Sequence, residues 1–176
     1  MIKRMKGINK WCGLWLSLLL LGGCSVAKYI PEGEQFYVGV GKIEYADKGT
    51  GFSDNSKLAR NELESVLNYK PNNSLLGSAK HRLPFSYPFF FDKYYAHSNN
   101  FFGRWLYKTF GEKPILLSEV NPELRATVAE QVLREYGYFH SSVTPEVTIV
   151  GKDSISARTS YHIAMGAPHV LDSINY

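Results

Sequence analysis

Cys24 is the residue whose chemistry and position are the most specific in this sequence. It follows Leu21, Gly22 and Gly23, so a branched apolar residue and two small ones stand directly before a thiol. A thiol is the nucleophile that forms a thioether to a diacylglycerol, and two glycines leave the preceding backbone open to a peptidase. The spacing predicts cleavage after Gly23 and lipid attachment at Cys24.

The residues before Cys24 have the organisation of an export signal. An apolar run, residues 11–21, follows a basic stretch that contains Lys3, Arg4, Lys6 and Lys10. This run is much shorter than the roughly 20 apolar residues of a membrane-spanning helix. With Leu21 to Cys24 it resembles the signal and lipobox of bacterial lipoproteins, which implies removal of residues 1–23 and anchoring of the acylated Cys24 in a lipid bilayer. The alternative is an ordinary signal peptide with an incidental cysteine.

Removal of the signal changes the charge and the cysteine content of the chain. The precursor has 20 Lys and Arg, 16 Asp and Glu, and a net charge of +4. Four of the basic residues lie in the signal, which leaves 16 of each sign, and we expect no nucleic-acid partner. Cys12 is lost and Cys24 carries the lipid, so no thiol remains for a disulfide, a zinc site or a cysteine nucleophile.

Other residues capable of chemistry lack the spacing that catalysis or metal binding needs. The serines that could serve in a hydrolytic set do not lie in a Gly-x-Ser-x-Gly turn. The histidines are scattered, without acidic partners at metal-ligand spacing on a helix face. We therefore expect no enzyme, no metal and no cofactor. The residues considered are Ser74, Ser78, Asp92 and His97 for hydrolysis, and His81, His97, His140, His162 and His169 for a metal.

Hydrophobic periodicity predicts two amphipathic helices. The first, over residues 56–69, ends before Pro71. The second begins with Asn121 as N-cap and Pro122 at the first helical position, and it ends at Gly137. The predicted apolar faces are Ala59, Leu63, Val66 and Leu67 in the first helix, and Leu124, Val128, Val132, Leu133 and Tyr136 in the second.

Three strands are predicted around these helices. Residues 24–35 are predicted to form a tether between the lipid and the first folded element. After it, β-branched and aromatic residues predict a strand over 37–45. A strand over 143–150 contains Pro145, which confines that portion to a sheet edge or a bulge. In residues 155–163 apolar and polar residues alternate, which predicts the second strand of a hairpin with one buried face.

Residues 71–117 are dense in aromatic side chains and follow no regular period. A short helix is predicted over 100–110. The rings either fill the volume over the sheet or form an exposed surface for a barrel, a chaperone or a lipid leaflet. We favour the core for most of them and the surface for Tyr94, Tyr95 and Trp105.

The order β-α-α-β-β predicts an α+β fold and resembles the POTRA domain of the BamA/TamA family of outer-membrane protein assembly factors. The resemblance lies in Tyr136-Gly137-Tyr138-Phe139, in Met165-Gly166-Ala167-Pro168 and in the following Val170-Leu171-Asp172-Ser173-Ile174. It implies a three-stranded mixed sheet with two helices on one face. Residues 36–168 would form this domain, with an aromatic-rich insertion at about 71–117, and residues 169–176 the first strand of a following, truncated unit.

The lipobox and two further segments resemble the lipidated members of this family in Bacteroidota. These segments are Tyr29-Ile30-Pro31-Glu32-Gly33-Glu34 and Pro71-Asn72-Asn73-Ser74-Leu75-Leu76-Gly77-Ser78. The resemblance implies a lipid-anchored module on the periplasmic face of the outer membrane, which binds and positions outer-membrane protein clients or assembly subunits without catalysis. In POTRA-type domains clients can add to a sheet edge, and the candidate edge here is the strand over 143–150.

Family members carry a membrane β-barrel after these units, and no amphipathic strand series follows Tyr176. We therefore expect a fragment, the product of an interrupted reading frame, or a separately encoded periplasmic portion. The alternative function is a free-standing envelope lipoprotein that acts as a scaffold or binds a ligand through its aromatic segment.

Overall fold

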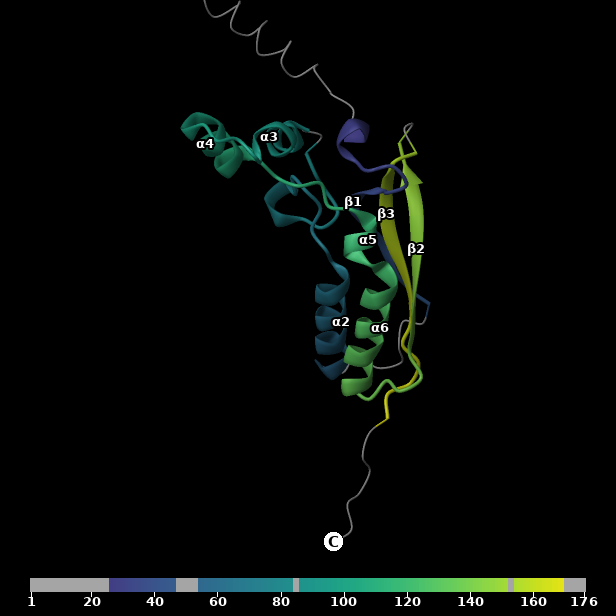
Figure 1. The fold of residues 1–176 in the computed structure, drawn as a ribbon. Coiled ribbons are helices and arrows are strands. Elements are labelled where there is room, and N and C mark those ends of the chain that lie inside the picture. The colour runs from purple at the N-terminus through teal and green to yellow at the C-terminus, as the bar shows by residue number, and fades with distance from the viewer. Residues whose placement is uncertain (1–25, 47–53, 84–85, 152–153, 170–176) are drawn as a thin grey trace, which may run out of the picture.

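The computed structural model describes residues 26–46, 54–83, 86–151 and 154–169. Its helices are arranged around a sheet that extends along the long axis of the molecule (Figure 1). In chain order the elements are η1 (Val26–Tyr29), β1 (Phe36–Tyr45), α2 (Asp54–Leu67), η2 (Leu75–Gly77), α3 (Tyr87–Tyr95), α4 (Phe101–Phe110), α5 (Leu117–Val120), α6 (Pro122–Glu135), β2 (Ser142–Val150) and β3 (Ser156–Ala164).

The three strands form one mixed sheet in the order β1-β3-β2. β1 runs parallel to the central strand β3, and β2 pairs with β3 as an antiparallel hairpin, from Ser142 opposite Ala164 to Val150 opposite Ser156. Helices α2 and α6 lie side by side against one face of the sheet (Figure 1). The predicted α+β class, with helices packed on a three-stranded mixed sheet, is confirmed.

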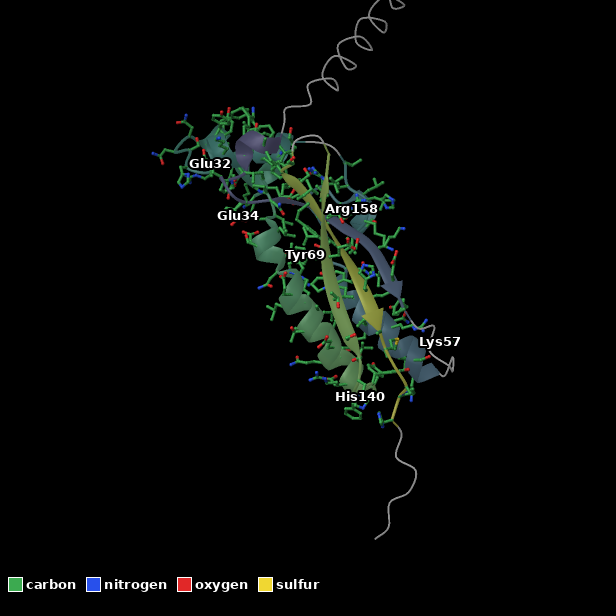
Figure 2. The ribbon with its side chains drawn as sticks, turned by 90° about the vertical axis from the view of Figure 1, so that its right-hand side faces the viewer. Glu32, Glu34, Lys57, Tyr69, His140 and Arg158 are labelled. Atoms are coloured by element: carbon green, nitrogen blue, oxygen red, sulfur yellow. The ribbon has the colours of Figure 1, made fainter. Side chains whose placement is uncertain are left out.

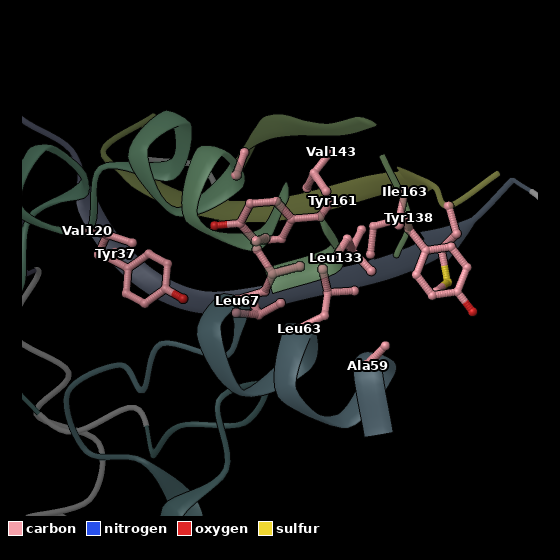
Figure 3. Close-up of a cluster of buried hydrophobic side chains, with 14 residues drawn as sticks. Tyr37, Ala59, Leu63, Leu67, Val120, Leu133, Tyr138, Val143, Tyr161 and Ile163 are labelled. Atoms are coloured by element: carbon pink, nitrogen blue, oxygen red, sulfur yellow. The ribbon is translucent and has the colours of Figure 1, made fainter. Parts of the chain in front are cut away.

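The core lies between this sheet and the two helices (Figure 3). Along β3 buried and more exposed residues alternate, and Ala157, Thr159, Tyr161 and Ile163 face the helices. The predicted alternation is therefore confirmed. From α2, Leu63 and Leu67 are fully buried against the sheet, as the predicted apolar face of that helix requires.

Both ends of α6 follow from its sequence. The Asn121 side chain accepts a hydrogen bond from the Leu124 N–H at 3.1 Å, and Pro122 occupies the first turn, where its missing N–H costs nothing. After Glu135 the chain turns through Gly137 at a φ of 88°, a left-handed value that glycine adopts without strain. The predicted N-cap and C-terminal glycine are confirmed.

The apolar face predicted for α6 is partly wrong. Leu124 is 58% exposed and Val128 is also exposed, on the side of the helix away from the sheet. The fully buried row instead uses Ala126, Ala129 and Leu133. Both sets of residues have helical spacing. The set that contains the alanines is the buried one, because a small side chain lets α6 pack closely against α2 and the sheet.

Asn72 links the beginning and the end of the segment that connects α2 to α6. Its side chain is 1% exposed, donates to the Lys113 carbonyl at 2.8 Å and accepts from the Ile115 N–H at 2.6 Å. These two bonds join the chain that enters the segment to the chain that leaves it. Nothing in the local pattern of residues 71–117 indicates this pairing, because the two partners lie about forty positions further along the chain.

Replacing Asn72 with alanine is expected to lower the free energy of unfolding by about 2 to 3 kcal/mol, because two part-buried backbone groups lose their partner and the buried side chain is lost. Chemical denaturation followed by circular dichroism measures this loss. The control is Asn99→Ala, at an exposed asparagine between α3 and α4, with an expected change within about 0.5 kcal/mol. Equal effects of the two substitutions would contradict the bridging role of Asn72.

Candidate functional site

The first half of the outer edge of β1, up to Val40, is covered by other parts of the chain. The Tyr37 N–H donates to the Ile115 carbonyl at 2.9 Å, and the Val40 N–H donates to the Ala79 carbonyl at 2.8 Å. The Leu117 N–H adds a bond to the Gln35 carbonyl. The part of this edge up to Val40 is therefore paired already and offers little backbone to a partner.

The other edge of the sheet, along β2, is only half covered. The Val143 N–H donates to the Glu130 carboxylate at 2.9 Å, so Val143 points its amide away from β3. The pairing with β3 has a constant register, so Pro145, Val147 and Ile149 point the same way. Pro145 has no N–H, and Val147 and Ile149 have no partner for theirs in the part of the chain that the structure describes.

The open half of this edge is therefore residues 147–150. The side chains of Val147 and Ile149 are 40% and 43% exposed on the helix-covered face of the sheet, although they are apolar. The prediction that this strand forms a sheet edge is confirmed by the strand order, and Pro145 blocks only its middle. The role of Glu130 was not predicted from the sequence, because a glutamate on a helix surface is ordinary and no local pattern links it to Val143.

A shallow pocket of about 420 Å³ opens beside Val147. It lies between β2, the start of α6 and the chain that leads into β1, near Glu34 in Figure 2. The Ser118 hydroxyl donates to the Glu34 carboxylate at 2.8 Å within it. Glu34 and Glu123 are the charged residues among those that line it, and the others are Gly33, Gln35, Leu117, Ser118, Asn121, Pro122 and Val147.

A pair of helices, α3 and α4, extends from the body of the domain near η1 (Figure 1). We call residues 87–110 the aromatic hairpin. The prediction that most aromatic rings of residues 71–117 lie in the core is wrong, because Phe89 is the buried one among those whose side chains the structure describes. The predicted exposure of Tyr94 and Trp105 is confirmed, and Tyr95 is half-buried. Further exposed rings are Phe90, Phe101, Phe102 and Phe110.

The two serines considered for catalysis form local hydrogen bonds. The Ser78 hydroxyl accepts bonds from the Lys80 and His81 amides and lies 3.4 Å from the His81 ring. The Ser74 hydroxyl donates to the Ser78 carbonyl at 2.7 Å. Asp92 lies on α3 and His97 follows that helix, whereas Ser74 and Ser78 flank η2, so the hydrolytic set is divided between two elements.

The remaining histidines lie at two separate places. His162 stands on the outer face of the sheet, with Nε2 3.0 Å from Glu146 and Nδ1 3.5 Å from Glu44. The His140 and His169 rings are 5.5 Å apart, at the end of the domain where α6 leads into β2. Within the described ranges, no group of three or more His, Cys, Asp or Glu is placed to hold a metal ion.

Two of the tyrosines with a strongly raised pKa are buried residues of the core, Tyr37 and Tyr161. Burial raises the pKa of Tyr161 to about 12 and raises the pKa of Tyr37 further. The Tyr37 hydroxyl donates to the Tyr69 carbonyl at 2.9 Å, which satisfies its polar end. Both phenols are therefore neutral at physiological pH and serve as core residues that carry a hydrogen-bonding tip.

The predicted lipid site lies outside the described residues. This applies to Cys24, to Leu21, Gly22 and Gly23, to the signal peptide over 1–23 and to the strand predicted over 170–176. Among the helices that the structure describes, none is long and apolar enough to cross a membrane.

Comparison of the chain with models of known protein families, with curated proteins and with solved structures finds no match. The functional argument therefore depends on the sequence and on the geometry of this chain.

Proposed function

We propose that this chain is a periplasmic, lipid-anchored module of an outer-membrane protein assembly or translocation factor, and that its domain is of the POTRA type. The chain order β1, α2, α6, β2, β3, with residues 71–117 inserted between the two packed helices, supports this proposal. The module binds and positions clients or assembly partners and does not catalyse a reaction.

The open half of β2 carries the proposal. An extended segment that lies against residues 147–150 forms main-chain hydrogen bonds with Val147 and Ile149, as an added strand does in β-augmentation. Such bonds depend little on side-chain identity. They suit a protein that handles many clients, since strands of outer-membrane proteins differ in sequence and share an extended backbone.

The pocket beside Val147 adds a chemical preference to this edge. Glu34 and Glu123 give it a negative character, and no basic residue is among those that line it. A side chain that projects from an added strand into this pocket is favoured when it is apolar or basic, and it is disfavoured when it is acidic.

Acylation at Cys24 places the module at the periplasmic face of the outer membrane. The mature chain would start with Cys24-Ser25-Val26-Ala27-Lys28, which lacks the acidic run associated with surface display in Bacteroidota lipoproteins. Protease treatment of intact cells tests this orientation, because a periplasmic domain stays protected until the outer membrane is opened.

Site-specific crosslinking tests the client-binding edge. A photo-crosslinking residue in place of Thr148, which is exposed on β2, is expected to capture newly exported outer-membrane β-barrel proteins in cells. The same residue in place of Thr127, exposed on α6, is the control and is expected to capture none. Equal capture from both positions, or no barrel protein from Thr148, would contradict the proposal and favour the free-standing envelope lipoprotein.

Val147→Pro is expected to lower capture from Thr148 about fivefold, since it removes one edge hydrogen bond worth about 1 kcal/mol. The fold tolerates proline here because the Val147 nitrogen faces away from β3, as the Pro145 nitrogen does. Val147→Thr keeps the N–H and a side chain of similar size, and it is expected to leave capture unchanged. Unchanged capture with Val147→Pro would exclude main-chain pairing at this residue.

A further inference from the structure

The exposed rings of the aromatic hairpin form one continuous surface. The ring of Trp105 is 5.8 Å from that of Phe102 and 6.0 Å from that of Phe110. The ring of Phe110 in turn lies 5.6 Å from the ring of Phe91 on α3, and the Phe91 ring contacts that of Phe90. Soluble monomers seldom expose so many adjacent large rings, and such patches mark contact with a protein or a membrane.

Helix α4 turns these rings away from the rest of the protein. Gly103 is buried, and a Cβ at that position would lie 2.8 Å from the Ser98 Cβ and 3.1 Å from the Tyr95 ring. The Gly103 side of α4 therefore faces α3. Phe101 and Phe102, which are 88% and 65% exposed, lie with Trp105 on another side of the helix.

Basic residues border the exposed rings. At helical spacing, Arg104 and Lys108 lie one turn apart on the same side of α4, next to Phe101. Helix α4 contains no acidic residue. An apolar face of Trp and Phe bordered by Lys and Arg is the composition of a helix that lies in a membrane interface, where anionic headgroups meet the cations.

The hairpin also lies at the end of the domain that the lipid would hold. The Lys93 ammonium on α3 donates to the Lys28 carbonyl of η1 at 2.9 Å, and the Tyr29 and Phe89 rings are 6.2 Å apart. Val26, where η1 begins, is two residues after Cys24. Two extended residues span about 7 Å at most, so the acylated residue stays close to this hairpin.

We propose that the aromatic hairpin is a second membrane contact, which inserts Phe101, Phe102 and Trp105 into the phospholipid leaflet that carries the acylated Cys24. Arg104 and Lys108 lie among its anionic headgroups. This inference depends on the acylation in the proposed function and goes beyond it, because one lipid tether permits free rotation and a second contact fixes the orientation of the domain.

The fixed orientation has a consequence for the open edge of β2. Val150, at the end of that strand, packs in the same apolar cluster as Phe89 of the hairpin and Tyr29 of η1. The edge that receives an extended client therefore ends close to the membrane contact. A client bound along residues 147–150 would be held near the bilayer surface.

Trp105 reports on this insertion directly. The three tryptophans of the chain are Trp11, Trp15 and Trp105, and the first two lie in the signal, so Trp105 is alone in the mature protein. The acylated protein is reconstituted into vesicles of phosphatidylethanolamine and phosphatidylglycerol. We expect Trp105 emission to shift to shorter wavelength, to be quenched by lipids brominated near the glycerol end of the acyl chain, and to become protected from iodide.

Matched variants separate insertion from general hydrophobic adhesion. Phe101→Ser with Phe102→Ser is expected to remove most of the emission shift, and Arg104→Glu with Lys108→Glu to weaken it on anionic vesicles. Leu124→Ser with Val128→Ser, at the exposed apolar pair on α6, is the control and is expected to leave the shift intact. An emission shift that depends on protein concentration rather than on lipid would indicate pairing of two copies and overturn the proposal.

A synthetic tether separates this inference from the acylation itself. Cys24 is the single thiol of the chain from residue 24 onward, so a maleimide phospholipid couples the protein to vesicles at that residue without cellular acylation. Mass spectrometry of the cell-derived protein tests acylation independently. If the tethered protein leaves Trp105 open to iodide and out of reach of brominated lipid, the second contact is refuted, whatever the acylation result.

Discussion

Replacing Leu63 with alanine is expected to lower the free energy of unfolding by about 3 to 4 kcal/mol. Leu63 is fully buried where α2 packs on the sheet, in contact with residues of both helices and the strands (Figure 3). Truncation removes buried apolar atoms of the side chain and leaves a cavity that the close-packed neighbours cannot fill. Chemical denaturation of the domain measures this loss.

Leu124→Ala is the matched control, since it removes the same atoms from the exposed side of α6. The expected change is within about 0.5 kcal/mol. This pair also tests the orientation of α6, because the helical pattern in the sequence alone would place Leu124 in the core. A loss at Leu124 comparable to that at Leu63 would show that α6 is rotated from the position described.

Replacing Cys24 with alanine is expected to abolish acyl labelling of the protein completely, because no other thiol remains after the signal is removed. Cells grown with alkyne-tagged palmitate, followed by membrane fractionation, measure both the label and the location of the chain. The variant protein is expected to accumulate uncleaved or to appear in the soluble fraction, since two or more acyl chains are needed for stable anchoring.

Cys12→Ala is the control for this substitution, because Cys12 lies within the predicted signal peptide and is expected to carry no lipid. Labelling and membrane association should match those of the unmodified chain. Label that persists in the Cys24→Ala protein would refute the lipid site. Loss of label in both variants would indicate a defect of export rather than of acylation.

The elements of the sheet were predictable because each has a local cause. Three predictions depended only on neighbouring residues: the alternation along residues 155–163, the Asn121 N-cap and the glycine at the end of α6, Gly137. The structure agrees with all three. The packed face of α6 was not predictable by counting large apolar residues, because two rows of helical spacing compete in one helix. Close packing against α2 selected the row with Ala126 and Ala129.

The features that shape the sheet edge and the inserted segment come from residues far apart in the sequence. Asn72 and Ile115 meet across the base of the inserted segment, and Glu130 meets the Val143 amide at the edge of the sheet. The aromatic rings of residues 71–117 were expected mainly in the core because large rings are usually buried. They lie outside because the hairpin leaves the sheet, which the spacing of the rings does not reveal.

Amide exchange at the edge of β2 tests the central claim most directly, that this module receives an extended strand along residues 147–150. The probe is a synthetic peptide of alternating valine and lysine, whose lysines suit the pocket that contains Glu34 and Glu123. We expect added peptide to slow exchange of the Val147 and Ile149 amides and to leave the Tyr37 and Val40 amides, which are already paired, unchanged. Unchanged exchange at Val147 and Ile149 with saturating peptide would contradict this claim.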